Sequence, residues 1–519
     1  MEVIDVRQLR DVIKDGDSIA ATGFSKSGMP FYLFKGIEDS FLECGHPCDL
    51  EFNCVAMGGV NIPGTYHDHF GHRGLLSKIR VSHIALAPGI NEQIDNNIIP
   101  GYMYPLGVLA QLYRDMGAGK PGVISKVGLG TYVDPRQEGG RMNSISVGDV
   151  AKLIKIDGEE WLFYPKFGLD VALIKATYAD TKGNISLDKE PCKSDAFIAA
   201  QAVKQNGGTV IVQVEEIVDY PQIPAREVEI PDFLVDYVVI EPVELRRQTA
   251  GTVYEPALCQ KERADLSELT PKPLNIRKII ARRATMELNE GDRVNLGYGI
   301  PELCGDVAAE EGMEDAFTLT VECGLIGGVP GSGWDFGAAR NADYVTDIVG
   351  IMDWYDGGGL DSCVLGMAEV DSTGNVNVTK FGSWTGPGGF INITNSAETN
   401  VFCGTMTAGG LKVAASDGRL EIVQEGKKKK FVNKVEQISF NALLAKQAGH
   451  SVIYITERAV FELTDEGLVL TEIAPGIDLE TQILSQIDFD VKIAADLKEM
   501  DPRIFTDEPM GLSERGLSK

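Results

Sequence analysis

Residues 317–328 of this chain, FTLTVECGLIGG, place a charged side chain at the end of an apolar strand. Phe317, Leu319 and Val321 alternate with threonines, and this period of two predicts a short β-strand. Glu322 follows directly and is itself followed by a glycine-rich segment. Ligands bind outside the carboxyl ends of strands in open parallel sheets, and glycines let them approach the backbone. Glu322 is therefore a candidate for contact with substrate, although this pattern alone favours a surface glutamate beside a turn.

Other segments predict parallel strands buried on both faces. Residues 208–214 (GTVIVQV) and 236–240 (DYVVI) are continuous apolar runs rich in β-branched residues, typical of strands covered by helices on each side. Residues 451–473 predict an antiparallel pair with a turn at residues 465–467. We predict an α/β fold with mostly parallel sheets flanked by helices, and an active site between two halves.

Two patterns recur in the same order along the chain, which indicates two homologous halves. A helix, an acidic turn, a strand and a glycine loop surround Asp17 and again Asp292, and a D-x-x-G-N segment between strands begins at Asp180 and again at Asp371. Asp180 and Asp371 are closer together in sequence than Asp17 and Asp292. The first half therefore has more residues between its two patterns than the second half has, which indicates an insertion in the first half. The polar segment 258–276 contains two prolines and predicts the join, with domains at 1–262 and 275–519.

The composition excludes several classes of protein. The 519 residues carry a formal charge of −28, which argues against general nucleic-acid binding and against an anionic membrane surface, but leaves room for a small polyanion in a local basic pocket. The sequence shows neither a signal peptide nor an apolar run of membrane-spanning length. Nine cysteines without a secretory signal do not predict disulfides. We expect a cytoplasmic protein.

Several familiar sites are absent or have a simpler interpretation. The sequence has no G-x-S-x-G nucleophile elbow, no phosphate-binding P-loop and no complete dinucleotide fingerprint. Three clusters are interpreted as structural, with zinc or phosphate binding as the alternative: HDHFGH at 67–72, the cysteines at 44, 48 and 54 around His46, and the lysines at 427–430, which we read as a solvated turn. No metal site is predicted.

A second glycine-rich segment, GSWTGPGGF at 382–390, follows the second D-x-x-G-N unit. Ordering so many glycines is costly, because glycine loses the most conformational freedom on folding. A set of bare backbone N–H groups directed at an oxygen, as in an oxyanion hole, would justify that cost. A simple turn between strands is an equally good interpretation of this segment alone.

Together these segments resemble the family I coenzyme A transferases. Asp15–Pro30 (DGDSIAATGFSKSGMP) is similar to the first signature of the family, with Thr22 where many members have glycine. Val321–Gly324 (VECG) is similar to the second, in the form of the single-chain acetate and propionate CoA-transferases rather than the Glu-Asn-Gly form of the succinyl-CoA:3-ketoacid enzymes. The resemblance covers nearly the whole chain, including residues 128–143, 163–165, 356–360, 403–412 and 474–478.

The resemblance implies two fused NagB/RpiA/CoA-transferase-like α/β domains and a covalent mechanism. Glu322 would be the nucleophile of a ping-pong transfer of CoA between a short-chain acyl-CoA and a carboxylate such as acetate, propionate, butyrate or a 3-ketoacid. CoA would be a substrate, and no tightly bound cofactor would be required. The alternatives are a CoA or small-ligand sensor on the same fold, since fold alone does not give function, and an acyl-CoA hydrolase.

The resemblance also implies the residues around Glu322. The oxyanion and CoA-binding residues would be Gly388, Gly389, Gly297, Tyr298, Gly299 and Ile300. The acyl pocket would include Gly23, Phe24, Leu106 and Gly107. Leu106 stands where many relatives have glutamine, which would make the pocket more apolar and favour a longer or different acid. Relatives form closed oligomers, so a homotetramer or homodimer is expected.

Overall fold

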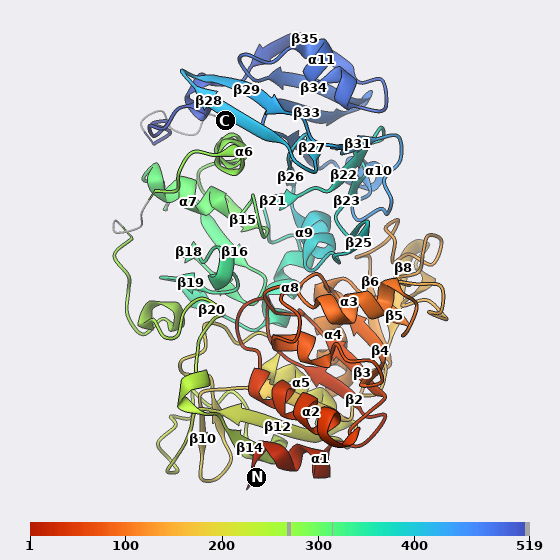
Figure 1. Cartoon of the computed structure of the whole chain (residues 1–519), viewed down its shortest axis with the longest axis vertical. Coiled ribbons are helices and arrows are strands. Elements are labelled where there is room, and N and C mark those ends of the chain that lie inside the picture. Colours follow the sequence, from red (N-terminus) through yellow and green to blue (C-terminus); the bar gives the residue numbers. More distant parts are fainter. Residues whose placement is uncertain (267–270, 314, 514–519) are drawn as a thin grey trace.

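The computed structural model describes residues 1–266, 271–313 and 315–513, and it contains two large sheets that follow one another along the long axis of the molecule (Figure 1). The first sheet is built from residues 2–240 and the second from residues 293–499. Four residues of the predicted join, 267–270, lie outside the described ranges. The boundaries at 262 and 275 stay a prediction.

The first sheet has eight strands, and every neighbouring pair is parallel. Its order is β1 (Glu2–Val3), β14 (Tyr237–Ile240), β12 (Thr209–Val214), β9 (Val171–Lys175), β2 (Ser18–Ala21), β3 (Leu50–Cys54), β4 (Leu76–Val81) and β5 (Gly101–Met103). The central strands are buried along their whole length, because helices cover both faces. The two runs predicted from β-branched residues are confirmed as β12 and β14. The helices are α1 (Leu9–Val12), α2 (Phe31–Cys44), α3 (Pro88–Asp95), α4 (Leu106–Gly117) and α5 (Ala196–Gln205).

The second sheet has ten strands with a parallel centre. Its order is β20 (Tyr344–Val345), β17 (Leu325–Ile326), β16 (Thr318–Val321), β15 (Arg293–Leu296), β21 (Ser362–Gly366), β26 (Thr399–Cys403), β32 (Ser451–Ile455), β33 (Ala459–Thr464), β34 (Gly467–Ile473) and β35 (Lys492–Glu499). The predicted antiparallel pairing near the C-terminus is confirmed in β32, β33 and β34. The helices are α6 (Ile276–Thr285), α7 (Leu303–Glu310), α8 (Ile348–Asp356), α9 (Phe390–Ser396), α10 (Ala442–Gln447) and α11 (Leu479–Gln482).

The internal repeat predicted from the sequence is visible in the strand order. In the first half β2 lies between β9 and β3, and in the second β15 lies between β21 and β16. Each D-x-x-G-N segment forms the same turn, in which a carboxylate oxygen of Asp180 or Asp371 accepts backbone N–H groups two and four residues later. The strands beside these turns form two matching three-stranded sheets: β10 (Tyr178–Asp180), β11 (Ile185–Ser186) and β13 (Glu216–Val218), and β22 (Glu369–Asp371), β23 (Val376–Asn377) and β31 (Phe431–Val432).

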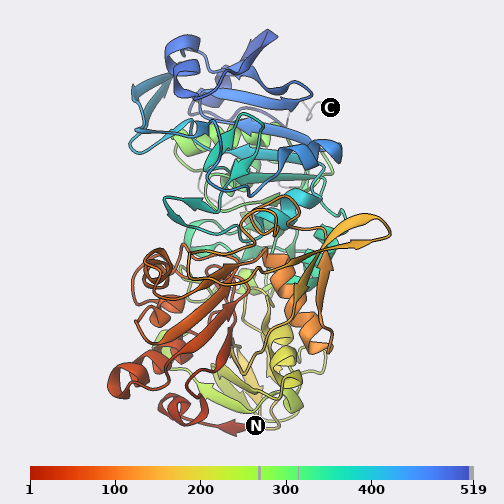
Figure 2. The ribbon, with the colours of Figure 1, turned by 90° about the vertical axis from the view of Figure 1, so that its right-hand side faces the viewer.

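The insertion predicted for the first half contains a small antiparallel sheet. Its strands are β6 (Gly122–Ser125), β7 (Lys152–Ile156) and β8 (Glu159–Pro165). In Figure 2 the hairpin of β7 and β8 projects from the body of the molecule. The second half has no counterpart of this sheet between β15 and β21 in its described residues.

The structure agrees with the structural interpretation of the histidine cluster at 67–72, but not with a solvated turn over the whole lysine run at 427–430. His69 Nδ1 and His72 Nε2 contact the two carboxylate oxygens of Glu38 at 2.8 and 2.7 Å, so this cluster ties a short 3₁₀ segment and the residues after it to α2. Within the described ranges no group of three or more His, Cys, Asp or Glu side chains is arranged to hold a metal ion.

The interpretation of residues 427–430 as a solvated turn is wrong for Lys430, which is 7% exposed and whose pKa burial lowers to about 8. Among the described residues no helix combines the length and the apolar character needed to span a bilayer.

The two halves meet where α4 packs against α8 and α9. The N–H of Gly107 donates to Oδ1 of Asn392 at 3.0 Å, and the amide of Asn392 donates to Asp356 at 2.9 Å. The side chain of Gln111, one turn further along α4, donates to Asp353 and Asp356 at 3.0 and 2.8 Å. These bonds need a close approach of α4 to α9, which the absence of a side chain at Gly107 permits.

Replacing Gly107 with alanine should destabilise the protein by about 1–3 kcal/mol, the usual cost of overpacking a close contact. A Cβ atom there would lie 2.5 Å from Nδ2 of Asn392 and 2.9 Å from Sδ of Met352. Urea unfolding measures the change in the free energy of unfolding. Gly305→Ala in α7 is the matched control, because its Cβ would have no neighbour closer than 3.6 Å. Equal stabilities of the two variants would contradict this account of the interface.

Candidate active site

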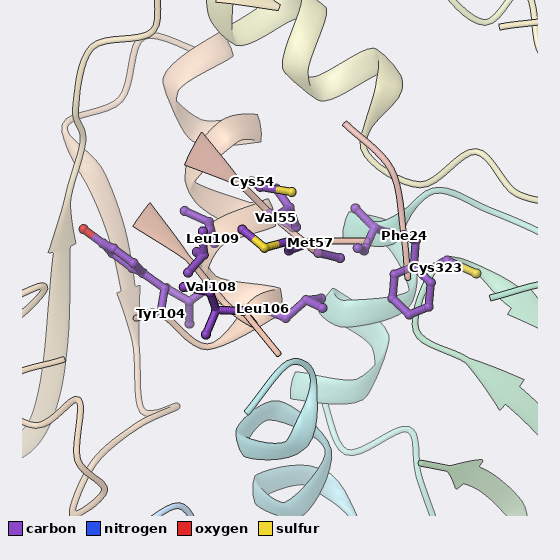
Figure 3. Close-up of a cluster of buried hydrophobic side chains, with 14 of the residues drawn as sticks. Phe24, Cys54, Val55, Met57, Tyr104, Leu106, Val108, Leu109 and Cys323 are labelled. Carbon is purple, nitrogen blue, oxygen red and sulfur yellow. The ribbon is translucent and has the colours of Figure 1, made fainter. Parts of the chain in front are cut away.

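A cavity of about 290 Å³ lies between the two halves, and both contribute to its walls. The first half supplies Phe24, Ser25, Ala56, Met57, His83, Ala85, Leu86 and Leu106, and the second supplies Gly297, Tyr298, Glu322, Phe336, Leu365, Gly366, Val378, Thr385, Gly386, Pro387, Gly388, Gly389 and Phe390. Figure 3 shows Phe24, Met57 and Leu106, from three separate segments, in one cluster with Cys323, the residue after Glu322. The lining is mostly apolar, and no lysine or arginine is part of it.

Glu322 stands at the carboxyl end of β16, in the turn that leads to β17. The N–H of Gly324 closes this turn on the carbonyl oxygen of Val321 at 3.0 Å. Gly324 has a φ of 112°, and a Cβ atom there would lie 2.1 Å from the carbonyl oxygen of Thr346, so only glycine fits. Glu322 is 7% exposed and lines the cavity. The alternative of a surface glutamate beside a turn is therefore wrong.

The Glu322 carboxyl group is held in an environment that disfavours its charge. Burial raises its pKa to about 7, and hydrogen bonds from its own backbone N–H and from the Asn295 side chain lower it by less. Its Oε2 atom and Oδ1 of Asn295 both lack a hydrogen-bond partner among the described residues. Either a proton on Glu322 or a reversed Asn295 amide would satisfy both atoms. The carboxyl group thus has one oxygen whose hydrogen bond depends on the proton of Glu322 or the orientation of Asn295, and its raised pKa lets it exchange its proton near neutral pH.

This pKa predicts how a reaction that needs the carboxylate would depend on pH. Below about pH 7 the buried group is protonated and cannot attack, so kcat/KM should fall about tenfold for each pH unit, and above that value it should level off. The initial rate of the CoA exchange that the sequence resemblance implies, measured at subsaturating acyl-CoA between about pH 5 and pH 8.5, tests this. A flat profile across that range would contradict an essential carboxylate with a raised pKa.

The glycine loop at 386–389 supplies fewer free amides than the sequence suggests. The N–H of Gly386 donates to the carbonyl oxygen of Thr379 at 2.9 Å, and that of Gly388 donates to Ser82 at 2.8 Å. Among the described residues, the N–H of Gly389 has no acceptor. Gly389 is also the closest of these residues to the carboxyl group, since a Cβ on it would lie 3.0 Å from Oε1 of Glu322. The predicted set of bare N–H groups thus reduces to one amide beside Glu322.

Half of the other predicted site residues line the cavity, namely Phe24, Leu106, Gly297 and Tyr298. The side chain of Tyr298 is 54% exposed and meets the ring of Phe336 edge-on, with the ring centroids 5.2 Å apart. Phe336 in turn stacks on Phe24 at 6.2 Å, so aromatic rings from both halves meet at this side of the cavity. These positions agree with the prediction of a site shared by the halves.

Four predicted residues do not line the cavity: Gly23, Gly107, Gly299 and Ile300. The N–H of Gly23 bonds to Oδ1 of Asp195 at 3.1 Å, and a Cβ there would lie 2.7 Å from the Met29 side chain, so this glycine permits packing behind the loop. Gly107 permits the contact between α4 and α9 described above. Gly23 and Gly107 thus have packing roles in this structure, and their part in the acyl pocket stays a prediction. Gly299 and Ile300 lie outside the cavity, and their contact with CoA stays a prediction.

The sequence analysis missed Met57, His83 and Asn295. Met57 and His83 follow β3 and β4 and reach the cavity only because the parallel sheet brings these strand ends together. Asn295 is a fully buried polar residue in the middle of β15, and an amide in a short apolar strand is a signal that could have been noticed.

Comparison with known proteins agrees with this geometry. Residues 6–241 match the family model described as Coenzyme A transferase. The caffeate CoA-transferase of Acetobacterium woodii is 42% identical over 98% of this chain and 98% of its own length. This chain belongs to the coenzyme A transferase family. A second CoA-transferase, the acetate CoA-transferase YdiF of Escherichia coli K12, is 44% identical over 84% of this chain and 82% of its own.

A solved CoA-transferase structure has the same fold. The acyl-CoA transferase YdiF of E. coli O157:H7, described as a thioester complex with CoA, superposes with a TM-score of 0.92 at 38% identity, over 98% of this chain and 97% of that one. The predicted family I membership, the α/β fold of two halves and the assignment as a transferase enzyme are confirmed. CoA is the substrate that the family shares.

Proposed function

We propose that this protein transfers CoA between an acyl-CoA and a free monocarboxylic acid by a ping-pong reaction through a thioester on Glu322. The observation that carries the proposal is a buried carboxyl group with one unpartnered oxygen, beside the free amide of Gly389, in a cavity walled by both halves. The relatives named as caffeate and acetate CoA-transferases support the reaction class.

The chemistry needs only the carboxylate and the two substrates. An oxygen of Glu322 attacks the thioester carbon, the C–S bond breaks, and CoA leaves as a thiolate while an acyl-glutamyl anhydride forms. The thiolate then attacks the glutamyl carbonyl carbon, the C–O bond breaks, and the first acid leaves as a carboxylate. A second carboxylate reverses these steps and leaves as the new acyl-CoA. One thioester replaces another, so the exchange requires no ATP.

The cavity also provides for the charge that develops during these steps. Each tetrahedral intermediate carries an oxyanion, and a backbone N–H directed at it stabilises the transition state. The N–H of Gly389 is the candidate donor, because the amide of Gly388 is already bonded to Ser82. Loss of such a donor typically raises the barrier by about 2.7–4 kcal/mol.

The lining favours an acid with a single carboxylate. The cavity contains no lysine or arginine to pair with a second carboxylate, and Leu106 gives an apolar wall where many relatives have glutamine. A buried unpaired charge is strongly unfavourable, so dicarboxylic acids should be poor substrates. Short monocarboxylic acids such as propionate or butyrate, and longer apolar ones, fit this lining.

Mass spectrometry of the protein after incubation with acetyl-CoA tests the proposal. We expect a CoA adduct on the peptide that contains Glu322, which disappears on addition of excess acetate and is absent from Glu322→Gln. Binding of acetyl-CoA without an adduct or exchange would indicate a sensor. Release of free CoA at a rate independent of added carboxylic acid would indicate a hydrolase. Either of these results would overturn the proposal.

A further inference from the structure

His83 is the one histidine among the residues that line the cavity. It follows β4 of the first half, keeps part of its surface exposed, and makes no hydrogen bond or ion pair with any described residue. Burial, and to a smaller extent the charge of Lys26, lower its pKa to about 4. At neutral pH the ring is therefore uncharged and offers one N–H donor and one nitrogen acceptor.

The local fold does not need this ring. Backbone bonds on both sides hold the segment: the carbonyl oxygen of Ser82 accepts from Gly388 at 2.8 Å, and the N–H of Ile84 donates to Thr385 at 2.9 Å. A partly buried ring without a protein partner keeps its N–H donor and its nitrogen acceptor available to a ligand in the cavity. Ser25, Thr385 and Tyr298 also line the cavity with hydroxyl groups, and a hydroxyl hydrogen can rotate toward whichever acceptor is near, whereas the imidazole nitrogens are fixed in their ring.

His83 and Glu322 lie beside opposite ends of the glycine loop at 386–389. A Cβ on Gly386 would lie 2.6 Å from the Cα atom of His83, whereas one on Gly389 would lie 3.0 Å from Glu322. Two residues separate these two glycines, so their Cα atoms are at most about 11 Å apart. Among the described residues no hydrogen bond or ion pair joins His83 to Glu322, and neither group shifts the pKa of the other. His83 and Glu322 thus line the same cavity, one from each half of the chain.

We propose that His83 is a specificity-determining residue that binds a hydroxyl or keto oxygen on the carbon chain of the acyl group. The inference rests on the proposed CoA transfer and narrows its substrates to monocarboxylic acids that carry one such oxygen on an otherwise apolar chain. A keto oxygen accepts the ring N–H. A hydroxyl group accepts that N–H or donates to the other nitrogen, so either tautomer of the ring can bind it. Phe24, Met57 and Leu106 contact the apolar remainder of the chain.

The test compares matched pairs of acids as CoA acceptors from acetyl-CoA: butyrate with 3-hydroxybutyrate and with 3-oxobutyrate, and 3-phenylpropionate with its ring-hydroxylated derivative. The measured quantity is the ratio of kcat/KM for the oxygen-bearing acid to that for its plain partner. For at least one pair we expect wild-type protein to favour the oxygen-bearing acid, and His83→Leu to lower that ratio about tenfold. His83→Gln, which keeps an N–H group, should restore part of it. Leu86→Val, an apolar change in the same wall, is the control and should leave the ratio within about threefold.

Two results would overturn the inference and leave the proposed function standing. One is a wild-type enzyme that exchanges CoA but prefers the plain acid in every pair, a result that does not depend on any variant folding. The other is a His83→Leu variant that alters both members of every pair by the same factor. Absence of exchange with every acid would instead overturn the proposed function itself.

Discussion

Glu322→Ala should lower the rate of CoA exchange by at least about 10⁴-fold, because the variant lacks the atom that forms the covalent intermediate. Its side chain is the one carboxylate in the lining of the cavity, so no neighbouring group can take over the attack. The assay is exchange of CoA between acetyl-CoA and labelled acetate. Exchange within about tenfold of wild type would exclude the mechanism. Glu322→Asp should also be severely impaired, since its carboxylate ends one methylene short of the reacting carbon.

Stability measurements separate loss of chemistry from loss of fold in these variants. The folded-state pKa of Glu322 is raised to about 7 from an ordinary value of 4.5, so the folded protein carries a buried, unfavourable charge at higher pH. This cost is absent below the ordinary pKa, grows as the pH rises through the interval, and is complete above about 7. Glu322→Gln should therefore be more stable than wild type by a few kcal/mol at about pH 8 but not at about pH 4. If Glu322→Gln is inactive but more stable than wild type at about pH 8, Glu322 lowers the stability of the protein and is retained for its function.

Gly389→Ala should have the second-largest effect, a loss of about 10²-fold in kcat. The backbone of Gly389 accepts alanine without strain, because its φ is −77°, but the new methyl group would lie 3.0 Å from Oε1 and 3.1 Å from Cγ of Glu322. The flexible carboxyl group would move by a few tenths of an ångström, and a misplaced nucleophile is costly in rate. Steady-state kinetics should show the loss in kcat, and the thermal midpoint should change little.

The control for this variant is Gly366→Ala. Gly366 also lines the cavity, and a Cβ there would meet no atom within 4 Å. Its loss of kcat should stay below about tenfold, so the contrast isolates contact with Glu322 from the mere addition of a methyl group. If the two variants lost the same activity, proximity of Gly389 to the carboxyl group would not explain its effect.

The parts of the fold that the sequence predicts are those set by local patterns. Alternation in 317–321 and the β-branched runs at 208–214 and 236–240 predict strands, because side-chain burial follows backbone period over a few residues. The repeated turns at Asp17 and Asp292 predict two halves. Glu322 is predicted because it directly follows such a strand.

The parts that the sequence does not predict depend on which strands become neighbours. His83 and Leu106 enter one cavity with Gly389 because β4, α4 and α9 meet across the two halves, and no short segment contains that information. The same reason explains why the sequence does not reveal the contact of α4 with α9 at Gly107 or the burial of Lys430. A glycine in a loop has the same appearance in the sequence whether it admits a ligand or a helix.

The loop around Gly388 has an evolutionary consequence. Its N–H bonds to Ser82 and its carbonyl oxygen to Leu106, so a residue of the second half is clamped by two segments of the first. Neither half on its own encloses the space in which Glu322 lies. If the gene were ever split at the join, the two products would have to be made in equal dosage and reassemble, and fusion in one reading frame removes that requirement.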